Sequence, residues 1–265
     1  DDDKEKKYIS FNKVTPKGEH KETIKEVPLE VDDDEYYFKT FYPISKSDES
    51  IELFGISRFE GEGITGLEPI SGIYILNLNL KTMEFDLKSK TLTEDEGDKL
   101  NKGEDEMKFN RIDAVYKQDG GYVVLAENNK LHTIIVQTQY GTSTTYLYYF
   151  NDINLFSVDK DLNFRWNNFM DRDFHTDGNI FGNSLSSTSV APIQVNLKPE
   201  RKGDEVTYIY STSEPENEIR RVTYNIKTGE KVSEVSLFEN DGVPSYSPGY
   251  QFPIGNNEYV TLLTE

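Results

Sequence analysis

The 265-residue chain has no cysteine, one tryptophan and three histidines. Without cysteine it can form no disulfide bond, no thiolate zinc site and no cysteine nucleophile. The histidines, His20, His132 and His175, are scattered without metal-ligand spacing, and no serine stands in a Gly-x-Ser-x-Gly elbow. The sequence therefore offers little support for a metalloenzyme or for a serine hydrolase.

Basic residues are also scarce, since 29 Lys and Arg face 48 Asp and Glu and leave a net charge of −19. Such an acidic chain is not expected to bind nucleic acid, whose phosphates require a basic surface, or an anionic membrane surface. No apolar run approaches the roughly 20 residues that span a bilayer. Solubility, cation binding or a basic partner all fit this acidic balance.

Aromatic residues are plentiful, with 17 Tyr and 15 Phe against 3 Met. Aromatic side chains favour strands over helices, and a chain of this length can bury one sizeable core. We therefore predict an all-β protein with a single domain over residues 8–265, preceded by a charged segment over residues 1–7.

The stretch from Asp119 to Met170 carries the clearest strand and turn signals. Asp119-Gly120-Gly121 supplies residues that tolerate positive φ between two strands. The apolar run Tyr122–Ala126 is too short for a helix and predicts a buried strand. The polar segment Asp159–Asn163 predicts a hairpin turn, and we expect Trp166, on the strand that follows, to pack between neighbouring sheets.

This stretch resembles a known kind of repeat. Gly120-Gly121-Tyr122 with its apolar run, then Asn151-Asp152-Ile153, then the segment Asp159–Trp166 resemble the "DGGY…D…KLDKDGNIIW" blades of bacterial extracytoplasmic β-propeller repeats, most closely those of large propeller-like proteins of Bacteroidota. The resemblance is good over residues 108–170 and looser over 70–86 and 218–236. It implies a propeller-like fold in the cell envelope and carries no catalytic residue.

One residue departs from that pattern. Leu162 stands where the repeats usually have glycine, so the turn must be built without one. We expect Asn163 to take the left-handed conformation instead, because Asn tolerates it better than most residues.

Hairpin turns near residues 81, 160 and 228 indicate an internal repeat. Each turn is short and polar and lies between two predicted strands. The repeat is longer than the 40–50 residues usual for one blade, and the chain accommodates about four to six blades. A β-sandwich is the alternative fold.

Residues 1–7 are all charged and are predicted to be disordered. They fit a solvated tail, the remnant of an engineered acidic cleavage tag, or the tether that follows the lipidated cysteine of Bacteroidota surface lipoproteins. The blade resemblance supports the third interpretation. It predicts an extracytoplasmic, outer-membrane surface lipoprotein that meets the membrane only through an N-terminal lipid anchor.

A long hairpin over residues 131–150 is the predicted binding surface. Its tip lies near Gly141, and its candidate contact residues are Thr144, Tyr146, Tyr148 and Tyr149. Tyrosine offers a large contact area at low entropic cost. The same tyrosines also fit ordinary strand positions, which is the alternative.

One candidate metal site lies in residues 171–189, which are predicted to form a loop. Asp171, Asp173, Asp177 and Asn179 offer the hard oxygen ligands that suit Ca²⁺. The spacing lacks the terminal bidentate Glu of an EF-hand, so a solvated acidic loop is the alternative. No other cofactor is predicted.

The predicted function is that of a non-catalytic binding or scaffold module that contacts a protein or glycan through its loops. The competing function is that of a glycoside hydrolase with carboxylates at the centre of a propeller. That chemistry requires two acids about 5–10 Å apart in one pocket.

Overall fold

A computed structural model of the protein describes residues 8–14, 20–28, 30–31, 34–46, 49–59, 72–82, 84–93, 95–96, 111–139, 141–177, 199–212, 218–239, 245–255 and 258–264. These ranges contain seventeen β-strands, which confirms the all-β prediction. No helix within the described ranges has the length and hydropathy needed to cross a bilayer.

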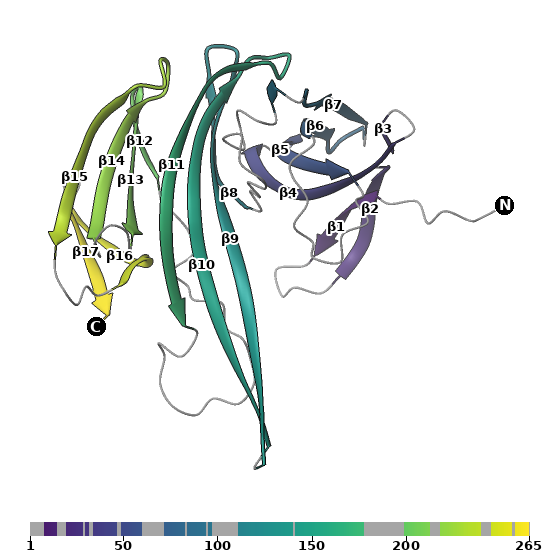
Figure 1. Ribbon diagram of the computed structural model, residues 1–265. Coiled ribbons are helices and arrows are strands. Elements are labelled where there is room, and N and C mark those ends of the chain that lie inside the picture. Colours follow the sequence, from purple (N-terminus) through teal and green to yellow (C-terminus); the bar gives the residue numbers. More distant parts are fainter. Residues whose placement is uncertain are drawn as a thin grey trace.

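Three sheets of consecutive antiparallel strands lie side by side and make up most of the molecule (Figure 1). Within each sheet the strands follow one another in sequence order, so every described neighbour is also the next strand in the chain. No sheet closes on itself in the described part of the chain. The first sheet holds β3 (Glu30–Val31), β4 (Asp34–Lys46), β5 (Ser50–Phe59), β6 (Gly72–Asn79) and β7 (Phe85–Thr91).

The second and third sheets contain four strands each, and two separate hairpins complete the described structure. The second sheet holds β8 (Arg111–Gln118), β9 (Gly121–Thr138), β10 (Gly141–Val158) and β11 (Phe164–Asp177). The third holds β12 (Glu200–Lys202), β13 (Glu205–Thr212), β14 (Glu218–Asn225) and β15 (Lys231–Glu239). The hairpins are β1 (Tyr8–Val14) with β2 (His20–Pro28), and β16 (Ser245–Gly255) with β17 (Glu258–Thr264).

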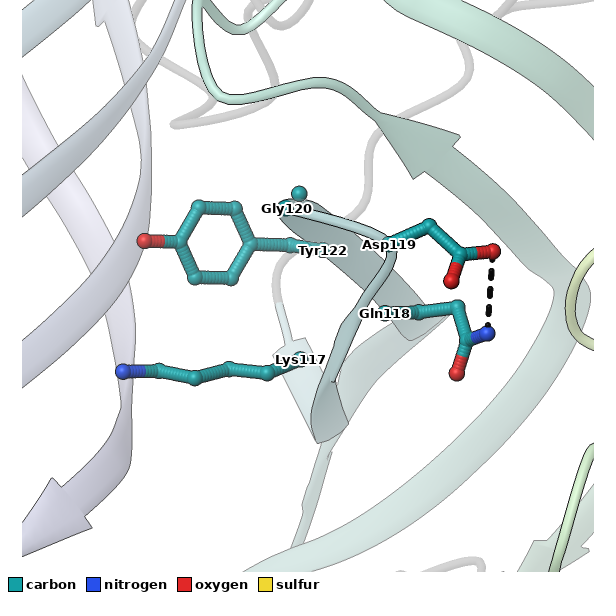
Figure 2. Close-up of a pocket in the computed structure, with 6 residues that line it drawn as sticks. Lys117, Gln118, Asp119, Gly120 and Tyr122 are labelled. Atoms are coloured by element: carbon teal, nitrogen blue, oxygen red, sulfur yellow. Dashed lines mark hydrogen bonds between the residues drawn. The ribbon is translucent and has the colours of Figure 1, made fainter.

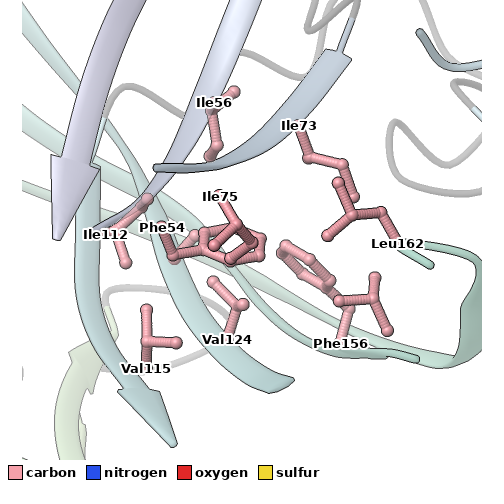
Figure 3. Packing of buried hydrophobic residues seen from close by; sticks show 11 residues of the cluster. Phe54, Ile56, Ile73, Ile75, Ile112, Val115, Val124, Phe156 and Leu162 are labelled. Atoms are coloured by element: carbon pink, nitrogen blue, oxygen red, sulfur yellow. The ribbon is translucent and has the colours of Figure 1, made fainter. Parts of the chain in front are cut away.

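The second sheet is covered on both faces, which explains why residues 122–126 of β9 are apolar without interruption. Val124, on one face, joins a cluster with Phe54 and Ile75 of the first sheet, and Figure 3 shows these side chains converging. Val123, on the other face, packs with Tyr208 of the third sheet. Successive side chains of a strand point to opposite faces, so residues 122–126 serve two cores, and Val123 to Ala126 are fully buried as predicted.

The β8–β9 turn uses two residues with positive φ, as the Asp-Gly-Gly segment predicts. Asp119 has φ 47° and Gly120 φ 72°, a combination typical of the hairpin turns that match strand twist. Gly121 is needed for a different reason. A Cβ atom there would collide with the Val158 carbonyl oxygen on β10.

The predicted hairpin turn at Asp159–Asn163 is confirmed. The Asp159 carboxylate accepts hydrogen bonds from the backbone N–H groups of Asp161 at 2.7 Å and Asn163 at 2.9 Å. The prediction that Asn163 takes the left-handed conformation is wrong, because Leu162 takes it, with φ 65°. Leu162 is fully buried in the core between the first and second sheets, and burial worth about 2 kcal/mol offsets a left-handed backbone that costs about 1–2 kcal/mol.

The internal repeat appears as one hairpin used in two sheets. In the β6–β7 and β14–β15 turns, an Asn side chain accepts hydrogen bonds from the backbone N–H groups two and three residues further on, and a Thr hydroxyl donates to a Glu. A Lys of each turn pairs with an acid of the neighbouring hairpin. The residues are Asn79, Lys81, Thr82, Glu84 and Glu49 in the first sheet and Asn225, Lys227, Thr228, Glu230 and Asp204 in the third.

Trp166 packs between the second and third sheets, as predicted. Its half-buried ring lies against the core cluster that these sheets share. Its indole N–H donates to the Lys227 carbonyl oxygen at 3.2 Å, and a Cβ atom at Gly229 would come within 2.6 Å of the ring. The β14–β15 turn therefore closes over the tryptophan.

Candidate functional site

The hairpin of β9 and β10 extends well beyond the rest of the second sheet (Figure 1). β8 pairs with β9 only from Gly121 to Glu127, and β11 pairs with β10 only as far as Leu147, opposite Asp177. Further out, residues 133–138 pair with residues 141–146, and no other described strand pairs with either segment. We call this two-stranded extension, residues 133–146, the ribbon. Its extent beyond the sheet confirms the predicted projecting hairpin.

Both faces of the ribbon are open to solvent. Ile134 and Ile135 are 39% and 67% exposed, and adjacent strand residues point to opposite faces. Gln137 and Gln139 are exposed as well. An isolated two-stranded hairpin is at best marginally stable in water, so the ribbon places Ile134 and Ile135 where the described sheets provide no core for them.

The four predicted contact residues fall into two pairs. Thr144 and Tyr146 lie on the ribbon, opposite Ile135 and Thr133 of β9. Tyr148 and Tyr149 lie nearer the sheet, where β10 also pairs with β11. The Tyr149 side chain is half-buried, and the side chains of the other three lie outside the described residues. Their role in binding stays a prediction.

Sequence reasoning missed the charge pattern of this hairpin. Residues 128–151 contain neither Asp nor Glu, and Lys130 is their single Lys or Arg. The chain as a whole has 48 acids in 265 residues, and residues 178–199 form a second acid-free interval of similar length. A count of acids along the sequence would have marked the hairpin, together with that second interval, without any structure.

A buried ionic cluster anchors the base of the hairpin. The Arg172 guanidinium on β11 pairs with the Glu127 carboxylate on β9 at 2.7 Å. It also donates to the backbone carbonyl oxygens of Phe150 at 3.0 Å and Asn151 at 3.1 Å on β10. The Arg172 and Glu127 side chains are 4% and 1% exposed. The arginine therefore connects three strands at the level where the hairpin leaves the sheet.

Asp113 adds a second carboxyl group to this cluster. It lies at a register irregularity of β8, its side chain is fully buried, and Arg111 Nε lies 3.0 Å from it. Neither Asp113 oxygen is hydrogen-bonded in the structure. Burial raises the pKa of Asp113 well above its usual value, and the adjacent Glu127 raises it further, while Arg111 and Arg172 oppose the shift. Asp113 therefore keeps its proton to a higher pH than an exposed aspartate does.

This pair of acids does not match the geometry of a glycoside hydrolase. Asp113 and Glu127 are in direct contact, whereas such enzymes separate their carboxyl groups by about 5–10 Å so that a sugar fits between them. The two side chains have essentially no exposed surface. The cluster stabilises the hairpin base and does not form a substrate site.

A shallow pocket of about 390 Å³ lies at the β8–β9 turn and is lined by Lys117, Gln118, Asp119, Gly120, Gly121 and Tyr122 (Figure 2). Beside it, the Tyr122 hydroxyl donates to Glu52 of β5 at 2.8 Å, and Lys117 forms an ion pair with the same carboxylate. Both oxygens of Glu52 are thus engaged by the second sheet. These groups join two sheets, and Asp119 is the only acid that lines the pocket.

The predicted loop that motivated a calcium site is partly a strand. Asp171, Asp173 and Asp177 all lie on β11, and six residues of extended strand separate Asp171 from Asp177 by about 20 Å. Calcium ligands lie within about 2.6 Å of the ion. Asn179 lies outside the described residues, and among the described residues no group of acids and histidines suits a metal. Calcium binding by this segment stays a prediction.

Comparisons with known proteins leave the family open. No family model matches the sequence. A search of curated proteins found no match. Among solved structures, the fold is similar to one described as "a putative hydrolase from Bacteroides ovatus", with 10% sequence identity and a TM-score of 0.29. The match covers 85% of this chain and 54% of that one, so the chain spans about half the length of the structure it matches. A likeness this distant carries no argument about activity.

Proposed function

We propose that the protein is a non-catalytic binding or scaffold module and that the ribbon is its contact surface. The observation that carries this proposal is the exposure of Ile134 and Ile135 on a two-stranded extension that pairs with no other described strand. Binding residues are commonly placed on segments that project from a rigid scaffold. The buried Arg172–Glu127 pair at the hairpin base supplies such a scaffold.

The proposal includes a propeller-like arrangement for the three central sheets, which would be successive blades. Its support is the sequence-ordered antiparallel topology of each sheet and the shared hairpin of Asn79 and Asn225. We also propose an outer-membrane surface setting with an N-terminal lipid anchor. The full gene product tests this setting, because a lipoprotein requires a signal peptide and a cysteine just upstream of the acidic segment.

A trimmed variant tests the binding proposal. It lacks residues 133–146 and joins His132 to Leu147 through an Asn-Gly turn. These two residues are already paired across the hairpin, and Asn-Gly suits a two-residue connection. The full chain and the trimmed variant serve as baits in a cell-envelope extract, and the bound proteins and glycans are identified. We expect at least one partner to bind the full chain and to be lost with the ribbon.

The controls separate loss of binding from loss of folding and from catalysis. The trimmed variant should keep the Trp166 fluorescence and the unfolding transition of the full chain, because none of the described side chains of the ribbon belongs to either core cluster. A variant with Tyr146, Tyr148 and Tyr149 changed to Ala then tests the aromatic contacts. Equal recovery of every partner by all three proteins would remove the ribbon from the site. Hydrolysis of aryl glycosides by the full chain would favour the glycoside hydrolase instead.

A further inference from the structure

The outer edge of β9 provides a long row of backbone hydrogen-bonding groups. β8 stops pairing with β9 at Glu127, and no described strand lies along this edge from residue 128 to residue 138. These residues span about 36 Å at 3.3 Å per residue. β9 and β10 keep a continuous register here up to the tip, where Thr138 pairs with Gly141. The edge is therefore regular enough to accept another strand.

The hairpin geometry indicates which residues direct their backbone groups outward. In a hairpin closed by two residues, the closing pair exchanges hydrogen bonds, and every second residue repeats this pattern. Counting back from Thr138, the even-numbered residues bond to β10. Residues such as Ile135 and Gln137 direct N–H and C=O groups to the open side, and their side chains are also exposed.

This edge lacks the charges found on the outer strands of the three large sheets. Proteins protect exposed edges with charged side chains, proline or bulges. The segment 128–138 carries only Lys130 and contains no proline. The edge strands of the three sheets are charged along their length, with Asp86, Lys88 and Lys90 on β7, Arg165, Asp171 and Asp173 on β11, and Lys231, Glu234 and Glu239 on β15.

We propose that the occupant of this edge is a second copy of the chain, with the two β9 edges pairing antiparallel about a two-fold axis. Outside residues 128–151 the chain holds 28 basic and 48 acidic residues, a net charge of −20, so most surfaces of two copies repel each other. The acid-free hairpin is one surface on which two such chains can meet without this repulsion, and it projects away from the charged body (Figure 1).

The pairing would create a continuous four-stranded sheet from two ribbons that are weak alone. An eleven-residue edge offers about ten main-chain hydrogen bonds, the number found in a typical specific interface. Recognition would depend on the backbone and on uncharged side chains, as in other cases of strand addition. The inference rests on the proposed function, since it names the partner of the same surface.

Sedimentation of the full chain tests the inference. The protein concentration should reach about 1 mM, because a dissociation constant of this order is the weak end of specific association. We expect a monomer–dimer equilibrium that Ile135→Lys weakens about tenfold or more, because it places a charged side chain within the paired edge of each copy. Val232→Lys is the matched control, since Val232 is a 53% exposed β-branched residue on another edge strand. Ile135→Val should retain the dimer.

Salt dependence separates this interface from one held by ion pairs. Raising the salt from about 0.05 M to about 0.5 M screens the repulsion between the two bodies and should tighten the dimer, whereas ion-paired contacts would loosen. Because the chain has no cysteine, single cysteines at Thr133, Ile135 or Gln137 can report the register, and disulfide formation should peak at one position.

Three outcomes would overturn the inference: a monomer at every concentration, equal weakening by Ile135→Lys and Val232→Lys, or a dimer that loosens with salt. If the wild type stays monomeric while the ribbon still captures another partner, the homodimer fails and the binding proposal stands. If the trimmed variant captures every partner and the wild type is monomeric, both fail.

Discussion

Replacing Asp113 by Asn should stabilise the protein at neutral pH, although it removes an acid from an ionic cluster. The folded chain holds the Asp113 proton because burial and Glu127 raise its pKa. The unfolded chain releases that proton above pH of about 4. Folding therefore binds a proton at pH values between the unfolded and the folded pKa of Asp113, and the stability that Asp113 contributes is complete below the unfolded pKa and is lost as pH rises toward the folded pKa.

The expected magnitude follows from this one proton. Between the unfolded and the folded pKa of Asp113, the free energy of unfolding falls by about 1.4 kcal/mol for each pH unit through this group. Asn has a similar shape and no proton to release. Over this pH range, the free energy of unfolding of the variant should therefore lose about 1.4 kcal/mol less per pH unit than that of the wild type. At neutral pH the variant should be more stable than the wild type.

Urea unfolding followed by tryptophan fluorescence measures this effect at a series of pH values. Trp166 is the single tryptophan and lies between two sheets, so it reports their separation. Glu127→Gln is the matched control with the opposite sign. It leaves the buried Arg172 charge without its partner and should destabilise by about 3–5 kcal/mol. If the free energy of unfolding depends on pH in the same way for the wild type and Asp113→Asn, the raised pKa of Asp113 is refuted.

Three further substitutions test the packing of the turns, each by urea unfolding. Gly229→Ala should destabilise by about 1–3 kcal/mol and shift the Trp166 emission, because a Cβ atom would contact the ring at a residue with φ 78°; unchanged emission would contradict this contact. Leu162→Gly relieves a left-handed backbone but loses a fully buried side chain, so a net loss of about 1–2 kcal/mol is expected, and a gain would show that strain outweighs burial. Tyr122→Phe should lose about 1 kcal/mol with its hydrogen bond to Glu52, and no loss would mean that the hydroxyl does not link the sheets.

Local signals in the sequence determined the strands and several of the turns. Asp119-Gly120 forms its turn because these residues tolerate positive φ, and the Asp159 side chain bonds to the backbone of its own turn. The run Tyr122–Ala126 is apolar at every residue, which marks a strand buried on both faces. Such features depend on residues a few positions apart, so they can be predicted without knowledge of the fold.

The hairpin was predictable in outline, and its charge pattern was available in the sequence. Residues 131–150 have the sequence features of two strands on either side of a turn near Gly141. The absence of acids from residues 128–151 can be read directly from the sequence. The length of the ribbon was not predictable. It depends on where β8 and β11 stop pairing with the hairpin, at Glu127 and Leu147, and those partner strands come from other parts of the chain.

Only the tertiary structure decided the rest of the candidate site. Arg172 and Glu127 are 45 positions apart in the sequence, and nothing near either residue indicates that the other will neutralise it. Asp173 and Asp177 are strand residues because β10 extends far enough to pair with them, although their local sequence favours a loop. Leu162 is left-handed because the first sheet supplies a core for its side chain. Burial and pairing between distant segments are properties of the assembled sheets, and they outweighed the local preferences at these positions.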